Sequence, residues 1–304
     1  MLILLVPVLI VLLFVVAIIL LCCKKKIVSA VVFILTIALN LYTESFPLHL
    51  GNLLSSSQKA ENTIRVISYN IKYSSDYLEQ QKDSLNGLIS FLETQDADIL
   101  VLPESRVWNN KNLRTKLLDL YPYNSFSGFK GSEIYVETAV FSRFPIENIC
   151  RLGEEYIYGM DIVLPNTKLK LIACHLASNQ YHSTLRGGEG LIDNLKKGFD
   201  NRRKQTQIIC DSLQLDSPQM PLLICGDMND LSGSHTISNI QNHHNLHDAW
   251  WKGGCGYGQT FNGKGLLLRI DHILYSDQLK LQRVDVIHKD YSDHYPLIAD
   301  FELQ

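Results

Sequence analysis

The chain has 304 residues, with 28 basic and 31 acidic side chains and a net charge of −3. All acidic residues follow residue 43. Three of the bases are Lys24, Lys25 and Lys26, so the rest of the chain carries a net charge of −6. This balance argues against a domain-wide basic face, the usual footprint of a non-specific nucleic-acid binder.

The N-terminus consists of two uncharged runs, residues 1–23 and 27–43, separated by the three lysines. A membrane-spanning helix needs about 20 apolar residues. The first run meets this length, and the second, with Asn40 inside it, is marginal. A cleaved signal peptide fits poorly, because no basic residue precedes the first run and the run is long. We therefore predict a membrane anchor of one or two transmembrane helices over 1–43.

The lysines between the two runs indicate the orientation of this anchor. Lysines beside a membrane span tend to stay in the cytoplasm. If both runs cross the cytoplasmic (inner) membrane, the remainder of the chain lies on its extracytoplasmic side. If only the first run crosses, the remainder stays with the lysines in the cytoplasm.

Residues 44–61 combine Pro, Gly and a Ser triplet, a composition typical of a linker. After them, short apolar runs alternate with helical patterns, which predicts a single α/β domain over 62–304. Its continuous apolar strands indicate two packed sheets flanked by helices. The predicted strands are 63–71, 97–105, 138–145, 169–176, 221–229, 267–276 and 295–303, and the predicted helices are 84–95 and 201–215.

Several other patterns favour a structural interpretation. No CxxC pair occurs, and the imidazoles of "HHNLH" (243–247) have no Cys or acid at ligand spacing, so we predict a solvated loop there and no zinc site. Cys174 and Cys225 end apolar runs and are expected to be buried. The basic stretch 202–204 is predicted to open a helix with a solvated face, and a phosphate contact is the alternative. "GQTFNGK" (258–264) lacks the Ser or Thr of a phosphate-binding loop and is predicted to be a flexible loop near the functional site.

Polar side chains gather where the predicted strands begin or end. They comprise four carboxylates, two amides and two imidazoles: Asn70, Glu104, His175, Asp227, Asn229, Asp271, Asp293 and His294. Carboxylate and amide oxygens suit Mg²⁺ or Mn²⁺. An imidazole oriented by a carboxylate suits a general base.

The blocks "SYNI", "LPES", "CHL", "GDMND", "RIDHIL" and "SDHYP" occur in this order over residues 63–304. In this respect the chain resembles the endonuclease/exonuclease/phosphatase superfamily, the DNase I-like proteins, and in particular membrane-anchored bacterial members. The resemblance implies a four-layer α/β sandwich of two mainly antiparallel sheets flanked by helices. It also implies Mg²⁺ or Mn²⁺ as cofactor.

The resemblance implies a role for each residue of the set. Glu104 would bind the metal, with Asn70 and Asp293 beside it. Asp227 and Asn229 would orient or activate the attacking water and hold the phosphate. His294 would pair with Asp271 and act on the water or the phosphate.

Two further residues follow from the same resemblance. His175 would contact a phosphate oxygen, and Glu137 would orient His175. The implied activity is divalent-metal-dependent hydrolysis of a phosphodiester by in-line attack of water, on a nucleic-acid or phospholipid substrate. The alternatives are a phosphomonoesterase acting on an inositol or lipid phosphate and a catalytically silent binding module at the membrane. No protein partner is implied.

Overall fold

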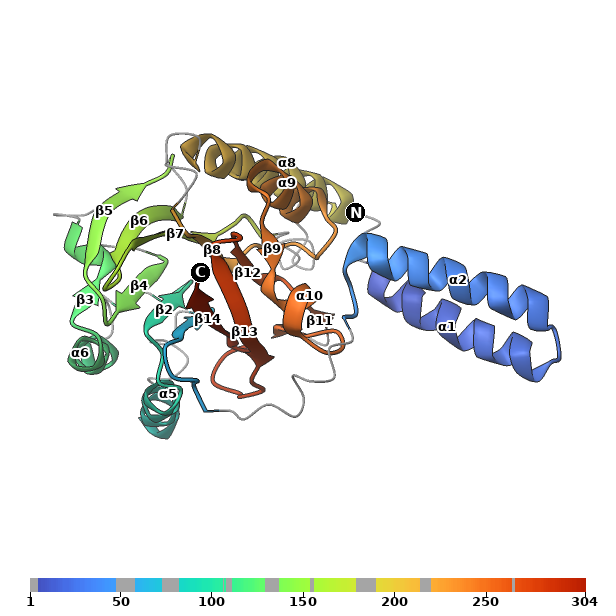
Figure 1. Cartoon of the computed structure of the whole chain (residues 1–304), viewed down its shortest axis with the longest axis horizontal. Coiled ribbons are helices and arrows are strands. Elements are labelled where there is room, and N and C mark those ends of the chain that lie inside the picture. The colour runs from blue at the N-terminus through green and yellow to red at the C-terminus, as the bar shows by residue number, and fades with distance from the viewer. Residues whose placement is uncertain are drawn as a thin grey trace.

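The computed structural model describes residues 5–47, 58–72, 82–105, 107, 111–128, 137–153, 156–178, 190–213, 220–263 and 266–304. Two apolar helices come first, α1 (Val6–Cys22) and α2 (Lys26–Thr43). They project from a body in which two β-sheets lie between layers of helices (Figure 1).

Each main sheet has six strands. The first, in the order β13-β14-β1-β2-β4-β3, contains β1 (Ile64–Ser68), β2 (Ile99–Leu102), β3 (Tyr123–Asn124), β4 (Ala139–Ser142), β13 (Leu279–Val286) and β14 (Leu297–Leu303). The second, in the order β5-β6-β7-β8-β12-β9, contains β5 (Ile146–Arg151), β6 (Ile157–Val163), β7 (Lys168–His175), β8 (Leu222–Asp227), β9 (His247–Asp248) and β12 (Asp271–Tyr275). In the described part of these sheets, only the β1–β2 and β7–β8 pairs are parallel.

The main core lies between the two sheets, because alternate side chains of each strand point inward. Val66 of β1 and Val101 of β2 meet Leu171 of β7 and Cys225 of β8 in one buried cluster. The intervening residues face outward and are also buried, so these strands appear in the sequence as continuous apolar runs.

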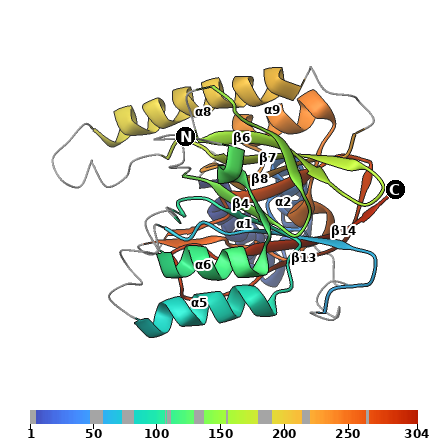
Figure 2. The ribbon, with the colours of Figure 1, turned by 90° about the vertical axis from the view of Figure 1, so that its left-hand side faces the viewer.

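Helices cover the outer faces of both sheets (Figures 1 and 2). The first sheet is covered by α5 (Lys82–Thr94) and α6 (Lys111–Leu120), with Leu88 and Leu117 in its outer core. The second is covered by α8 (Leu191–Leu213) and α9 (His235–His244), whose Ile209 and Ile240 lie in another buried cluster. The predicted α/β sandwich is confirmed.

Three local predictions need correction. The basic stretch 202–204 lies inside α8, not at its start, and Arg202 is fully buried with its Nε 3.2 Å from Asp230 Oδ2. Residues Phe261–Gly263, predicted as part of a loop, form β10, which pairs with β11 (Leu266–Leu268). His243 and His244 belong to the last turn of α9. Arg202 pairs with Asp230 in the segment after β8, β10 is paired with the adjacent strand β11, and α9 ends at Asn245 in a left-handed conformation.

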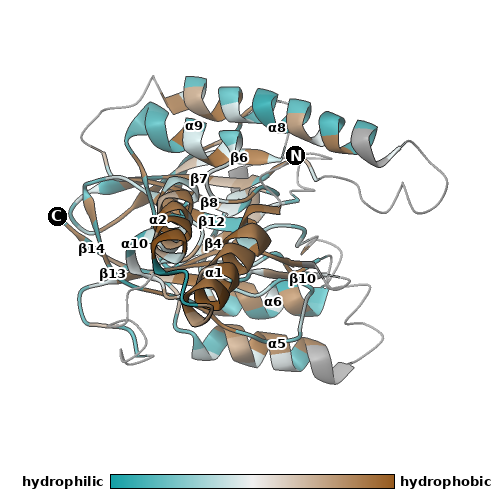
Figure 3. Cartoon of the chain, turned by 90° about the vertical axis from the view of Figure 1, so that its right-hand side faces the viewer, coloured by the Kyte–Doolittle hydropathy of each residue, from teal (hydrophilic) through white to brown (hydrophobic). Residues whose placement is uncertain are grey.

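The helices α1 and α2 form a hairpin with an apolar surface (Figure 3). Small residues hold the pair together, since Ser29 Oγ donates to the carbonyl of Ala17 at 2.7 Å. Of the described helices, α2 is long and apolar enough to cross a membrane, and α1 is a shorter apolar helix of 17 residues. The sequence had indicated the first run as the longer one.

The end of α2 packs directly against the body. Asn40, the polar residue in the second run, lies near this end, where its Oδ1 accepts from Phe46 N (2.9 Å) and its Nδ2 donates to Phe46 O (3.1 Å). Pro47 O accepts from Gly256 N at 2.8 Å. A Cβ on Gly233 would lie 2.8 Å from Thr43 Cα, so glycine permits this close approach. Residues 44–47 of the predicted linker therefore pack on the body, and 48–57 lie outside the described residues.

Candidate active site

One edge of the first sheet carries Asn70, Glu104 and His294. The parallel strands β1 and β2 end just before Asn70 and Glu104. β14 runs antiparallel to β1 and begins just after His294. Strand direction thus brings residues from three parts of the chain to the same edge.

The second sheet contributes a row of three neighbouring residues. His175 of β7 is in register with Asp227 of the parallel strand β8, and Asp227 is in register with Asp271 of the antiparallel strand β12. Gly226 makes this row possible, since its φ is +146° and a Cβ there would lie 1.8 Å from the carbonyl oxygen of Cys174.

The Asn70 amide joins the two sheets. Its Nδ2 donates to Glu104 Oε1 at 3.0 Å and to Asp227 Oδ2 at 2.9 Å, and the side chain is fully buried. Two carboxylate oxygens from different sheets therefore converge on one donor. Glu104 has a φ of 50°, a left-handed backbone conformation that is rare outside glycine and often found at functional sites.

His294 and Asp271 form the predicted pair. His294 Nδ1 lies 2.8 Å from Asp271 Oδ2, and Nε2 lies 3.6 Å from Asp227 Oδ2. Burial lowers the pKa of His294, but Asp271 and Asp227 outweigh it and raise the pKa to about 9. Asp271 is fully buried, and its Oδ1 has no hydrogen-bond partner within the described part of the chain.

His175 sits between three carboxylates. Its Nδ1 lies 3.2 Å from Glu137 Oε1, and its Nε2 lies 3.5 Å from Glu104 Oε1 and 3.8 Å from Asp227 Oδ2. Burial lowers its pKa, but the hydrogen bond to Glu137 and the other carboxylates raise it to about 9. Glu137 thus contacts His175 in the way that an orienting role requires.

The Asp227 carboxylate is at the centre of the cluster. Burial and the neighbouring Asp271 raise its pKa to about 6, against the opposing effect of the two imidazoles. One ligand atom each from Glu104, His175 and Asp227 lies within 4.8 Å of the others, and the same holds for Asp227, Asp271 and His294. This oxygen-rich donor set fits Mg²⁺ or Mn²⁺.

Asn229 and Asp293 lie at the periphery of these contacts. Asn229 N donates to Asp227 Oδ1 at 2.9 Å, and its Nδ2 donates to the carbonyl of Leu176 at 2.9 Å. Asp293 forms an ion pair with Lys72, and the preceding residue, Ser292, donates to the carbonyl of Asn70 at 2.8 Å. Asp293 is therefore linked to the cluster through its neighbours.

Sequence analysis missed three contacts of this site. Lys72 pairs with Asp293, and Phe261 packs its ring 4.9 Å from that of His294. Thr260 Oγ1 accepts from the backbone N–H of Asp271 at 3.1 Å. Lys72 lies two residues after Asn70 and belongs to no motif. Thr260 and Phe261 lie in the segment 258–264, which was expected near the site, but these contacts were not predicted.

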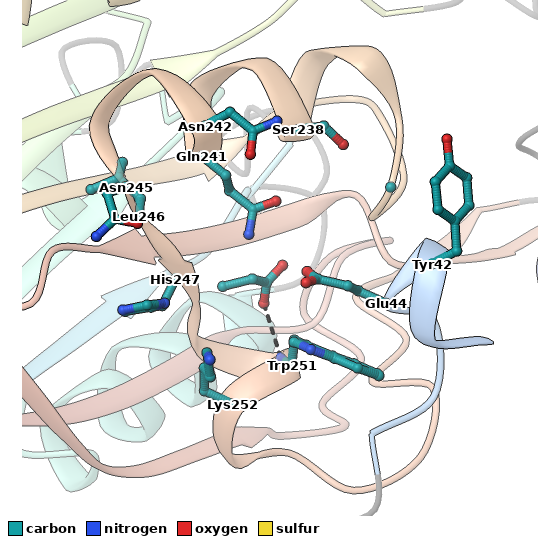
Figure 4. Close-up of a pocket in the computed structure, with 12 residues that line it drawn as sticks. Tyr42, Glu44, Ser238, Gln241, Asn242, Asn245, Leu246, His247, Trp251 and Lys252 are labelled. Atoms are coloured by element: carbon teal, nitrogen blue, oxygen red, sulfur yellow. Dashed lines mark hydrogen bonds between the residues drawn. The ribbon is translucent and has the colours of Figure 1, made fainter. Parts of the chain in front are cut away.

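A pocket of about 290 Å³ lies where α2 meets α9 and α10 (Ala249–Gly253). In Figure 4, Glu44 and Gln241 point into it from opposite sides, with Trp251 and Lys252 below. Burial and the nearby Asp248 raise the pKa of Glu44. None of the predicted site residues lines this pocket, which belongs to the junction between the apolar hairpin and the body.

The model of the Endonuclease/Exonuclease/phosphatase family matches residues 67–183 and 212–294. The two matched segments contain all eight strand-end residues and Glu137. The chain belongs to this family. No curated protein sequence matches the chain.

Solved structures share the fold at low sequence identity. A D. rerio TDP2 humanized by 14 mutations superposes with a TM-score of 0.59 and 18% identity, covering 80% of this chain and 100% of that one. A truncated Caenorhabditis elegans TDP2 gives 0.58 and 20%, covering 79% and 97%. Sphingomyelinase C from Streptomyces griseocarneus gives 0.55 and 16%, covering 78% and 99%.

Proposed function

We propose that this protein is a membrane-anchored, divalent-metal-dependent phosphodiesterase that hydrolyses its substrate by in-line attack of water. The observation that carries this proposal is the Asn70 amide, which brings Glu104 and Asp227 together between two carboxylate-bound imidazoles. A catalytically silent module has no need to bury this many mutually repelling carboxylates, because each one costs stability unless a cation or proton compensates it.

Glu104, Asn70 and Asp293 would hold the metal ion. When bound there, Mg²⁺ or Mn²⁺ supplies charge neutralisation on the phosphate and on the leaving oxygen. The Asn70 Oδ1 accepts from Lys72 N at 2.9 Å while its Nδ2 binds two carboxylates, so the amide orientation is defined on both sides.

Asp227, with Asn229 beside it, would orient the attacking water and accept its proton. A raised carboxyl pKa suits this task, since a base works best when its pKa is near the working pH. His294 and His175 would donate hydrogen bonds to the phosphate oxygens. Asp271 and Glu137 would hold the two rings in position, and the buried cluster would limit access of bulk water.

The apolar hairpin would place this site at a membrane. At about 1.5 Å per residue, α1 is roughly 26 Å long and α2 roughly 27 Å, close to the hydrocarbon thickness of about 30 Å. With Lys24–Lys26 at the cytoplasmic turn, the body lies on the extracytoplasmic side. The substrate is then a phospholipid or an extracellular nucleic acid, and a role in chromosomal repair is disfavoured.

The test uses the full chain in detergent with matched chromogenic esters. Bis(p-nitrophenyl) phosphate should be hydrolysed and p-nitrophenyl phosphate should not, and the same preparation is then screened on DNA, RNA, sphingomyelin and inositol phosphates. Preference for the monoester would replace the diesterase assignment with a phosphatase. No hydrolysis of any of these substrates would favour the silent module.

A further inference from the structure

Outside the candidate active site, α8 and α9 bring together three groups that bind soft metal ions. One ligand atom each of Cys210, His243 and His244 lies within 4.8 Å of the others. Cys210 is buried on α8, and the two histidines end α9. Local spacing could not reveal this set, because the cysteine comes from a different helix that packs on α9 only in the folded chain.

His244 is arranged as a metal-binding histidine would be. Its Nε2 is buried and has no hydrogen-bond partner among the described residues. The ring also makes a hydrogen bond with the backbone of Cys210, and because Nε2 has no partner, this bond belongs to Nδ1. With Nδ1–H as the donor, Nε2 carries the free lone pair, the usual state of a metal-ligating imidazole.

The protonation states of the apo groups are compatible with this arrangement. Burial and the nearby His243 lower the pKa of His244. Burial raises the pKa of the Cys210 thiol to about 11. A metal ion would therefore displace the thiol proton on binding, as thiolate sites generally require.

We propose that Cys210, His243 and His244 form a Zn²⁺ site, with water as the fourth ligand. One thiolate and two imidazoles are a borderline-soft donor set that suits Zn²⁺, whereas the oxygen-rich cluster at the strand ends suits Mg²⁺. Zn–S and Zn–N bonds of about 2.3 and 2.0 Å require the donors to close in by up to about 1.5 Å. The exposed His243 side chain gives the ion a route from solvent.

Occupation of this site would fasten α9 to α8 behind the candidate active site. α9 is capped by Ser234, which accepts from Ile237 N at 3.3 Å and lies only a few residues after Asn229. Thr236 of the same helix donates to Asp230, which also pairs with Arg202 of α8. The zinc site and these contacts would hold α9 at both ends.

Cobalt substitution tests the proposal independently of any catalytic activity. The full chain in detergent, reduced and with excess Mg²⁺, is titrated with Co²⁺ while thiolate-to-cobalt charge-transfer absorption is recorded. We expect a band that saturates at one equivalent and is bleached by Zn²⁺. The strand-end cluster offers only oxygen and imidazole donors and cannot produce this band.

Variants then assign the ligands. Cys210→Ser should lose the band, and His243→Gln should weaken Co²⁺ binding at least tenfold. His247→Gln is the matched control, because His247 lies on the same segment but pairs with Asp277. His243 is exposed, so its variant decides the question if Cys210→Ser does not fold. The proposal is overturned by a wild-type chain without the band, by a band that survives Cys210→Ser, or by unchanged affinity in His243→Gln.

Discussion

Among single residues, Asn70 has the most consequential contacts of the candidate site. One buried amide donates to Glu104 and Asp227, which belong to different sheets. Its removal would leave two carboxylates without a shared donor, and buried polar groups without partners are costly. The geometry of the site therefore depends on a contact between sheets that no local motif specifies.

The first prediction concerns the His294–Asp271 pair. His294→Ala should lower the rate of diester hydrolysis by about 100-fold or more, the usual scale for a positioned acid–base group, and His175→Ala should have a similar effect. If His294 and Asp271 act as a unit, Asp271→Asn should match His294→Ala, and the double variant should be little worse than either. Steady-state kinetics of the two single variants and the double variant tests this. If the double variant loses the product of the two single losses in rate, the residues act independently.

A second prediction concerns acid stability and Asp248. Burial alone would raise the pKa of Asp248, but Arg269, with Nη1 3.0 Å from Oδ2, and His272, with Nδ1 3.0 Å from Oδ2, hold it well below its usual range. Such a group contributes stability above its unfolded pKa of about 4, and the contribution is lost as the pH falls below that value.

Asp248→Asn should therefore lower the Tm by a constant amount between pH 6 and pH 8, and the gap to wild type should shrink below about pH 4. Thermal unfolding across this range measures the gap. A gap that widens toward acid pH would contradict the assigned charge state.

Between elements, the pair Arg65–Asp300 joins β1 to β14. Arg65 Nε and Nη2 donate to Asp300 Oδ1 and Oδ2, both at 2.7 Å, and both side chains are buried. These strands lead to the edge that carries Asn70 and His294. The pair thus helps to fix the register on which the site depends.

The third prediction follows from this burial. Asp300→Ala should destabilise the fold by about 3–5 kcal/mol, because it removes the carboxylate that compensates the buried Arg65 charge, while Nη1 keeps its bond to the carbonyl of Gln95. Glu302→Ala on the same strand removes an exposed pair with Lys280 and should cost no more than about 1 kcal/mol. Denaturant unfolding measures the free energy of unfolding of both variants. Equal losses would show that the buried pair contributes no more stability than the exposed one.

The sequence predicted the elements with a strong apolar pattern. The strands that became β1, β2, β4, β7, β8, β12 and β14 and the helices α5 and α8 were all expected. The strands β5, β6 and β13 were missed. β5 and β13 lie at sheet edges and are half exposed, with charged residues along their length, whereas β6 is buried but carries Gly159 and Asp161 inside its apolar pattern. Edge strands lack the continuous apolar pattern of central ones.

The candidate site was anticipated as a set of residues but not as a geometry. Strand-end position and family motifs indicated which side chains to expect together. They did not give the register that aligns His175, Asp227 and Asp271, or the contact of Phe261 with His294. Such features depend on pairings between distant segments, which local patterns do not encode. The burial of Arg202 was missed for the same reason.

At the scale of the whole molecule, the hairpin and the body form one connected unit. Phe46 packs its ring 5.3 Å from Tyr257, and Thr43 and Ser45 are buried at the junction. If the hairpin lies in a membrane, these contacts hold the body close to the lipid surface. Substrate access would then be governed by that surface.

The fourth prediction is the orientation of this unit. Because Lys24–Lys26 favour the cytoplasmic side, a C-terminal alkaline phosphatase fusion should be active. A C-terminal fluorescent-protein fusion exported by the same route should be dark. The reverse pattern would place the body in the cytoplasm and make intracellular nucleotides the candidate substrates.

The most direct test of the central proposal is the metal dependence of diester hydrolysis in wild type and Glu104→Gln. Wild type should be inactive in EDTA and recover with Mg²⁺. Glu104→Gln should lower the rate of hydrolysis at least about 100-fold at the same Mg²⁺ concentration, with an unchanged Tm. Loss of a residue that only orients a metal ligand typically costs about 10–100-fold. The exposed Glu147→Gln serves as the matched control and should behave as wild type. Full wild-type activity in EDTA, or an unaffected Glu104→Gln, would contradict the account.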